Sequence, residues 1–166
     1  MLGIARKPLH RYNSNMPKQI GRYLRYKLAF ERMDEALEEG WLLEAISLQE
    51  SIISDRLLSV LRHYGQSAES FKSLKCLIED CRKLAIGSSD WVDGDFFDEL
   101  DAWRVKRNRC IHEFCKMDAY AHDESSVEIF TDTMFETAMK GRELAGLVKE
   151  FSTSMKKMIP SSPSSS

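Results

Sequence analysis

Residues 127–158 read VEIFTDTMFETAMKGRELAGLVKEFSTSMKKM and predict one long helix. Apolar or small residues recur every seven positions in two series, Val127, Met134, Gly141, Val148 and Met155, and Phe130, Thr137, Leu144, Phe151 and Met158. Such a repeat is typical of a helix that packs lengthwise against a neighbour. Ser125 or Ser126, followed by Glu128, is the expected N-terminal cap. The stretch therefore predicts a long C-terminal helix within a helical bundle.

Four shorter helical segments precede this helix. Their apolar periodicity predicts helices over about 21–39, 41–64, 68–86 and 95–115. Gly40, Gly65 and Gly87 mark the breaks between them, and Ser67 is the expected cap of the third. The chain holds only 8 Gly and 4 Pro in 166 residues, which favours long helices over many short strands. We therefore predict an all-α fold, an antiparallel bundle of about five helices.

The two ends of the chain differ from this bundle, which we assign to residues 21–158. Residues 1–20 are predicted to form an irregular basic arm, because residues 1–30 hold seven Lys or Arg and no acidic residue. This arm is either solvated or a contact surface for RNA or for an acidic partner. Residues 159–166 contain only Ser and Pro apart from Ile159, and they are predicted to be disordered.

Composition also indicates the expected environment of the protein. No apolar run approaches the roughly 18 residues that a membrane span needs, and the N-terminal stretch does not resemble a secretory signal. The four cysteines form no C-x-x-C pair: Cys76, Cys81, Cys110 and Cys115. We expect free, mostly buried thiols in a reducing cytoplasm, with no metal and no cofactor. A metal hydrolase using the acidic residues of 90–101 is the weakest alternative, because acids at a helix start suit the helix dipole.

Two charges fall on apolar helix faces. Arg107 follows Trp103 by four positions and precedes Ile111 by four, in the middle of an apolar stripe. Glu50 takes a similar place in the segment 41–64, between Ile46 and Ile53. A buried guanidinium needs a partner, because burying an unpaired charge is costly. We therefore predict that Glu50 and Arg107 meet across a helix interface, where the pair either only orients the helices or supports a functional groove.

The residues around Arg107 favour the functional groove. Asn108 and His112 are four apart and so share one edge of the same helix. Three further basic residues, Arg104, Lys106 and Arg109, add positive charge and are candidate RNA contacts.

The string Arg107-Asn108-Arg109-Cys110-Ile111-His112 resembles the R-x4-6-H motif of the HEPN superfamily, in its form R-N-x-x-x-H. HEPN domains are small all-α bundles with this motif late in a long helix before a final helix, and the resemblance covers most of residues 30–158 in helix order. It implies a metal-independent endoribonuclease, often of a toxin–antitoxin or phage-defence system. It also implies a homodimer with the motif helices at its interface, and an antitoxin or a regulatory protein as a further partner. One branch carries a modifiable Tyr where this chain has Phe114, so that form of regulation is not expected.

The chemistry agrees with the residue types. RNA supplies its own nucleophile, the 2′-OH, and cleavage needs proton transfer and positive charge on the phosphate. His112 is suited to transfer protons near neutral pH, and Arg107 offers a planar fork to two phosphate oxygens. Asn108 would orient His112 or donate to the phosphate, and Glu50 would hold Arg107. The expected products are a 2′,3′-cyclic phosphate and a 5′-OH.

Two other functions remain open on sequence grounds. The first is a non-catalytic HEPN-like module that binds RNA or protein through the same residues. The second is a helical adaptor that uses the repeat of residues 127–158 to bind another protein. Solvent exposure of Val127, Phe130 and Met134 would favour the adaptor.

Overall fold

The protein is described here by a computed structural model, which places residues 18–66, 72–86, 91, 95–112 and 124–158. Within these ranges the chain contains five helices and no strand, which confirms the all-α class. The helices are α1 (Lys18–Glu38), α2 (Leu42–His63), α3 (Leu74–Ala85), α5 (Phe96–His112) and α6 (Glu124–Lys157).

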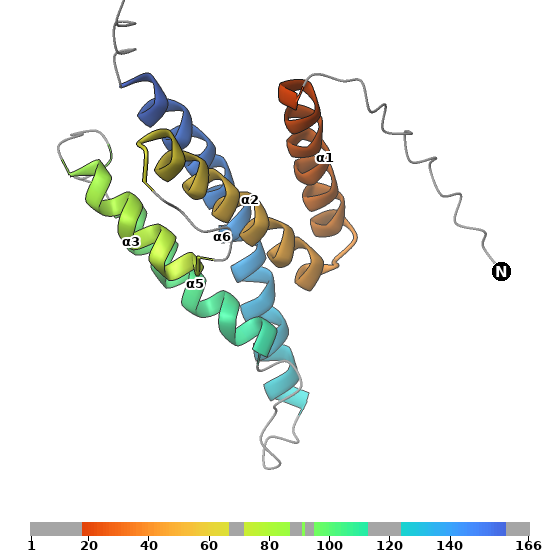
Figure 1. Ribbon diagram of the computed structural model, residues 1–166. Helices are drawn as coiled ribbons and strands as arrows, with labels where there is room; N and C mark the ends of the chain where they lie inside the picture. The colour runs from red at the N-terminus through yellow and green to blue at the C-terminus, as the bar shows by residue number, and fades with distance from the viewer. Residues whose placement is uncertain (1–17, 67–71, 87–90, 92–94, 113–123, 159–166) are drawn as a thin grey trace, which may run out of the picture.

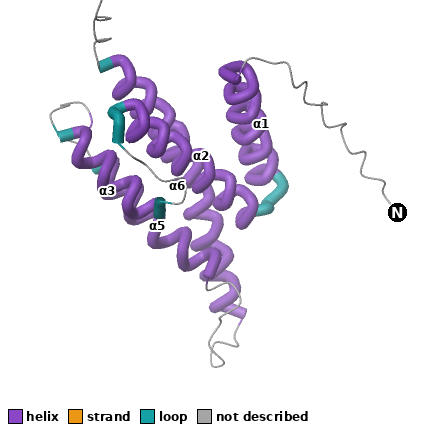
Figure 2. The backbone as a smooth tube through the Cα atoms, in the orientation of Figure 1, coloured by secondary structure: helices purple, strands orange, loops and turns teal. Residues whose placement is uncertain are grey.

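Helix α6 is the longest of the described helices and runs along the bundle (Figure 1). It has 34 residues, and at 1.5 Å per residue it is about 51 Å long. It packs along α2 and α5, while α1 covers the outer side of α2 and α3 lies against α2 and α5 (Figure 2). The predicted lengthwise packing is confirmed for the middle of α6, where Leu144, Val148 and Phe151 are fully buried. The repeat does not stay buried to its ends, since Val127 is 54% exposed and Met158 is 44% exposed.

The prediction of an antiparallel bundle is correct only in part. Residue pairs ascend together along α2 and α6, from Gln49–Ala138 to Ser59–Lys156, so these two helices run parallel. Helix α5 runs against α6 and against α3, as do α1 and α2 against each other (Figure 1). Helices α2 and α3 therefore point the same way. Ten residues separate the end of α2 from the start of α3.

The start of α3 corrects a predicted cap. The helix begins at Leu74, and the side chain of Ser73 accepts a hydrogen bond from the backbone N–H of Cys76 at 3.3 Å. The expected cap, Ser67, lies outside the described residues and is separated from this helix start by six positions. Serine is a favoured cap residue at either position, so the local sequence does not distinguish them.

The starts of α6 and α1 also differ from expectation. Helix α6 already includes Glu124, so Ser125 and Ser126 lie in its first turn rather than capping it. Helix α1 begins at Lys18, within the segment expected to be irregular. Residues 18–20 contain neither glycine nor proline, so their helix propensity does not oppose this early start. The expected breaks at Gly40 and Gly65 are confirmed, and both residues have positive φ, at 75° and 70°.

One junction fixes α2 and α5 on α6. The indole Nε1 of Trp103 donates to the carbonyl of Thr137 at 2.9 Å, and Nε2 of Gln49 donates to the carbonyl of Ala138 at 2.7 Å. Both side chains reach the α6 backbone because residue 141 is a glycine. A Cβ there would lie 2.7 Å from Trp103 Nε1 and closer still to Gln49 Oε1. Gly141 is therefore required for the close approach of three helices.

The described cysteines are Cys76, Cys81 and Cys110, and none of them forms a disulfide. Cys81 and Cys110 are buried, which agrees with the expectation of mostly buried thiols, and Cys115 lies outside the described residues. Of the helices described, none combines the length and the apolar character that crossing a membrane requires.

Replacing Gly141 tests the three-helix junction. We expect Gly141→Ala to lower the free energy of unfolding by about 2 kcal/mol, because overpacking and displaced hydrogen bonds outweigh the gain in helix propensity. Gly146→Ala is the matched control, since nothing lies within 4 Å of its added Cβ. That change should raise the free energy of unfolding by up to about 1 kcal/mol. Urea unfolding measures both, and equal effects at the two glycines would contradict the junction.

Thiol reactivity tests the burial of the cysteines. Burial, with a smaller contribution from Asp80, raises the pKa of the Cys81 thiol to about 12, so at pH 8 it stays protonated and unreactive. We expect iodoacetamide to label half-buried Cys76 in the native protein, and Cys81 and Cys110 only after unfolding. Mass spectrometry of native and denatured samples gives the readout. Labelling of native Cys81 as fast as Cys76 would rule out this packing.

Candidate functional site

The predicted contact between Glu50 and Arg107 is present. Nη2 of Arg107 in α5 forms an ion pair with Oε2 of Glu50 in α2, and the two side chains are 13% and 30% exposed. Nη1 of Arg107 donates to Oδ1 of the neighbouring Asn108 at 2.5 Å. Nε of Arg107 is buried without a hydrogen-bond partner among the described residues. Burial lowers the pKa of Arg107, but a guanidinium remains charged in proteins.

The helix faces explain why these two side chains meet. In α5, Arg107 lies on the same helix face as buried Leu100 and Trp103, because residues four and seven apart share one face. This face is turned toward α2. In α2, Glu50 lies on the face of buried Ile46 and Ile53 and points toward α5. The ion pair lies close to the three-helix junction. Glu50 directly follows Gln49 in α2, and Arg107 follows Trp103 by four positions, about one turn of α5. Local periodicity therefore specifies the contact.

His112 is separate from this contact. It is exposed in the last turn of α5, four residues after Asn108. Asn108 accepts from Arg107, and no hydrogen bond or ion pair between described residues joins His112 to either of them. Phe114 and the residues up to 123 lie outside the described part of the chain. The structure thus brings Glu50, Arg107 and Asn108 together and leaves His112 at the adjoining surface.

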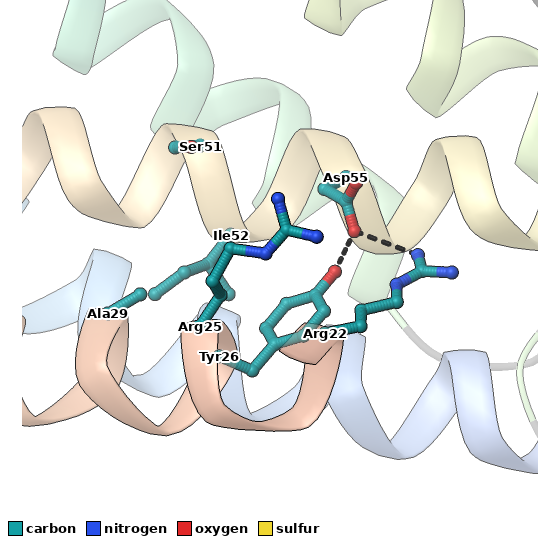
Figure 3. Close-up of a pocket in the computed structure, with 7 residues that line it drawn as sticks. All are labelled: Arg22, Arg25, Tyr26, Ala29, Ser51, Ile52 and Asp55. Atoms are coloured by element: carbon teal, nitrogen blue, oxygen red, sulfur yellow. Dashed lines mark hydrogen bonds and ion pairs between the residues drawn. The ribbon is translucent and has the colours of Figure 1, made fainter. Parts of the chain in front are cut away.

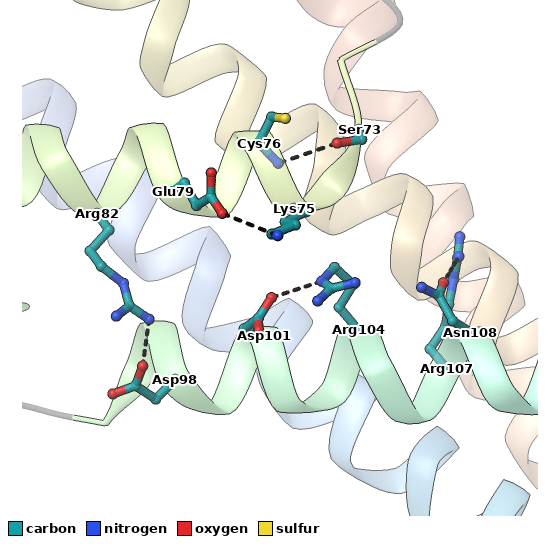
Figure 4. A network of polar contacts seen from close by, with 10 residues as sticks. All are labelled: Ser73, Lys75, Cys76, Glu79, Arg82, Asp98, Asp101, Arg104, Arg107 and Asn108. Atoms are coloured by element: carbon teal, nitrogen blue, oxygen red, sulfur yellow. Dashed lines mark hydrogen bonds and ion pairs between the residues drawn. The ribbon is translucent and has the colours of Figure 1, made fainter.

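The three neighbouring basic residues point in different directions. Arg104 is 17% exposed, and its Nε donates to Oδ1 of Asp101 at 2.7 Å on the side of α5 that faces α3 (Figure 4). This hydrogen bond lowers the pKa of Asp101. Lys106 is exposed toward α6, and Arg109 is exposed on the outer side of α5. Of the three, Arg104 shares an edge with Asn108 and His112, at spacings of four and eight residues.

A cavity lies on another side of α5, away from the contact between Glu50 and Arg107. This cavity of about 330 Å³ between α5 and α6 is lined by Trp103, Lys106 and Lys140 together with Glu99 and Glu136. Lys140 pairs with Glu99 and with Glu143, each at 3.0 Å, so the cavity walls carry balanced charge. Within the described residues, no group of three or more His, Cys, Asp or Glu side chains is placed to hold a metal. Asp90 and Asp93 of the acidic stretch lie outside those residues.

Sequence reasoning missed a further misplaced cation. Arg56 in α2 follows Ile52 by four positions and precedes Val60 by four, so it lies on a largely apolar face, as Glu50 and Arg107 do. It stacks on Tyr26 of α1, with the guanidinium carbon 3.7 Å from the ring centre. Lys156 of α6 lies close enough for Arg56 to lower its pKa, although burial is the larger cause. Its position between the apolar residues Ile52 and Val60, four positions away on either side, could have revealed Arg56 from the sequence.

Comparison with protein-family models, with curated proteins and with solved structures finds no match.

A double-mutant cycle tests the Glu50–Arg107 pair. We expect Arg107→Met and Glu50→Met each to lower the free energy of unfolding by about 2 kcal/mol, because each leaves a half-buried charge unpaired. The double variant should lose less than the sum, with a coupling energy above about 1 kcal/mol. The exposed pair Arg82–Asp98, at 2.6 Å, is the control, and its coupling should be smaller. Strict additivity at Glu50 and Arg107 in urea unfolding would show that the pair contributes no interaction energy.

Proposed function

We propose that the protein is a HEPN-like, metal-independent endoribonuclease that acts in the cytoplasm as a homodimer. The observation that carries this proposal is Arg107 held by Glu50 and Asn108 beside exposed His112. An arginine fixed on two sides presents its remaining donors in one orientation, which is the preorganisation that transition-state stabilisation requires. The R-N-x-x-x-H string supports the same conclusion.

Each residue then has a role in the reaction. Of the five N–H donors of Arg107, Glu50 engages one on Nη2, Asn108 engages one on Nη1, and the Nε donor is buried, so the second N–H of each terminal nitrogen remains for a phosphate oxygen. A general base removes the proton of the RNA 2′-OH, whose oxygen attacks phosphorus while the bond from phosphorus to the 5′-oxygen breaks. A general acid protonates that 5′-oxygen. His112 serves in one of these proton transfers, and Asn108 positions Arg107 rather than His112.

The dimer supplies the second proton-transfer group. One chain carries one His112, and a twofold axis beside α5 brings a second copy to the same site. Ala102, Val105 and Arg109 accompany His112 on the exposed side of α5, and Val105 is 46% exposed although it is apolar. An exposed valine on the face that carries His112 supports α5 as the dimer interface. An antitoxin that covers this face, in a toxin–antitoxin or phage-defence system, would control the activity.

A non-catalytic binding module is the second candidate. It is favoured by the use of Arg107 donors within the chain, since the ion pair with Glu50 then serves only to orient α2 and α5. The exposure of α6 favours an adaptor only at its start: Val127 is 54% exposed, but Phe130 is half-buried and Met134 is 9% exposed.

Analysis of RNA ends tests the ribonuclease. We expect the wild-type protein to cut single-stranded RNA in the presence of EDTA, leaving 2′,3′-cyclic phosphate and 5′-OH ends, and to leave DNA of the same sequence intact. His112→Ala should reduce the rate by at least about 100-fold, the usual contribution of a proton-transfer group. His63→Ala, which removes another exposed histidine, should keep the wild-type rate. Mass spectrometry of the products is the readout. Absence of cleavage by the wild type, or equal rates with and without His112, would reject the proposal and favour the binding module.

A further inference from the structure

Three cations from three helices gather at the other side of α2. We call them the basic cluster: Arg22 of α1, Arg56 of α2 and Lys156 of α6. Arg22 Nη2 lies 3.0 Å from Oδ2 of Asp55, and Lys156 Nζ donates to Oγ of Ser59 at 2.6 Å. Arg56 is held by its stacking on Tyr26, described above. The cluster shares no residue with the Arg107 site.

Among the residues that the structure describes, the charges of the basic cluster are not balanced. Asp55 is the carboxylate that pairs with it, and this same Oδ2 also accepts from the Tyr26 hydroxyl. Three cations and one carboxylate leave a surplus of two positive charges, of which Arg56 and Lys156 are half-buried while the Arg22 side chain is 50% exposed. Burial, followed by repulsion from Arg22, lowers the pKa of Arg56, and burial, Arg22 and Arg56 lower the pKa of Lys156. The cations therefore repel one another at a place where water screens them poorly.

Two further observations indicate a ligand. Nε of Arg56 is buried and has no hydrogen-bond partner among the described residues, so one N–H of the cluster lacks an acceptor. A cavity of about 160 Å³ lies between α1 and α2, on the side of the cluster where Arg22 stands, and Arg22 is the cluster cation that lines it (Figure 3). Arg22, Arg25, Tyr26 and Asp55 line it, so a fourth cation faces this space. A water molecule occupies about 30 Å³ in the liquid, and the cavity is therefore large enough for a tetrahedral oxyanion.

We propose that the basic cluster binds a phosphate group, either free orthophosphate or a phosphodiester of an RNA strand. The surplus of positive charge favours an anion of more than one charge, such as orthophosphate, and planar guanidinium groups donate to two oxygens of one phosphate. The bound oxyanion replaces the missing counter-charge of Arg56 and Lys156 and relieves their mutual repulsion. This site goes beyond the ribonuclease proposal, because phosphate binding here requires neither Arg107 nor His112.

Thermal unfolding provides the first arm of the test. At equal ionic strength, replacing chloride with 10 mM orthophosphate should raise the Tm of the wild-type protein by about 3 °C. Lys156→Gln should lose most of this shift. Lys157→Gln removes the same charge from the adjacent, exposed lysine and should keep it. Glutamine can retain the hydrogen bond to Ser59, so without phosphate the Lys156→Gln variant should have a Tm equal to or above that of the wild type.

Binding of a fluorescent single-stranded RNA provides the second arm. All proteins carry His112→Ala so that cleavage does not interfere, which separates this result from the fate of the ribonuclease proposal. Lys156→Gln and Arg56→Gln should each weaken binding about fivefold, and each should reduce the slope of log affinity against log salt by about 0.7. Lys157→Gln should leave affinity within about twofold of its parent. A response to orthophosphate alone identifies free phosphate as the ligand, and a response to RNA alone identifies the strand. If neither ligand distinguishes Lys156→Gln from Lys157→Gln, the proposal is overturned.

Discussion

The close approach of Gln49, Trp103 and Gly141 is the constraint from which the rest of the arrangement follows. Two side chains donate to consecutive carbonyls of α6, and they reach those carbonyls because the glycine has no side chain to keep them away. Helices α2 and α5 are thereby fixed in register on one long helix. Glu50 follows Gln49 directly, and Arg107 is one turn after Trp103, so the same junction that sets the register also places the ion pair.

Arg107 and Arg56 are both cations on largely apolar helix faces, but their surroundings compensate the charge in different ways. Each is a guanidinium on a largely apolar helix face, with a buried Nε that lacks a partner among the described residues. For Arg107, α2 supplies a carboxylate, and the charge is neutralised within the chain. For Arg56, the nearby groups are an aromatic ring and two further cations, with one shared carboxylate. A cation without its own counter-ion in a half-buried place favours an anionic ligand, whereas a paired cation is held in one orientation and offers only the donors that its partner leaves free.

The pairing of Arg107 also changes the roles that we propose for the residues of the R-N-x-x-x-H string. Asn108 contacts Arg107 and not His112, so the first two residues of the string act as one unit with Glu50. His112 remains on the exposed surface of α5, together with Val105. A reaction that needs two proton-transfer groups then depends on a second chain, because one exposed histidine per α5 cannot act as both acid and base in a single step. In the proposed ribonuclease, dimer formation would control the activity.

The sequence alone determined the helices, the breaks at Gly40 and Gly65 and the contact between Glu50 and Arg107. Each of these is readable locally, because apolar periodicity, glycine flexibility and the cost of burying a charge act over a few turns of one helix. Tertiary structure decided the rest: the start of α3 at Ser73 rather than Ser67, the parallel course of α2 and α3, and the basic cluster of Arg22, Arg56 and Lys156. The members of that cluster are separated by up to 134 positions in the chain, and they meet only because α1 and α6 pack on α2. No local pattern encodes such a meeting, because it depends on the packing of whole helices and not on the spacing within one of them.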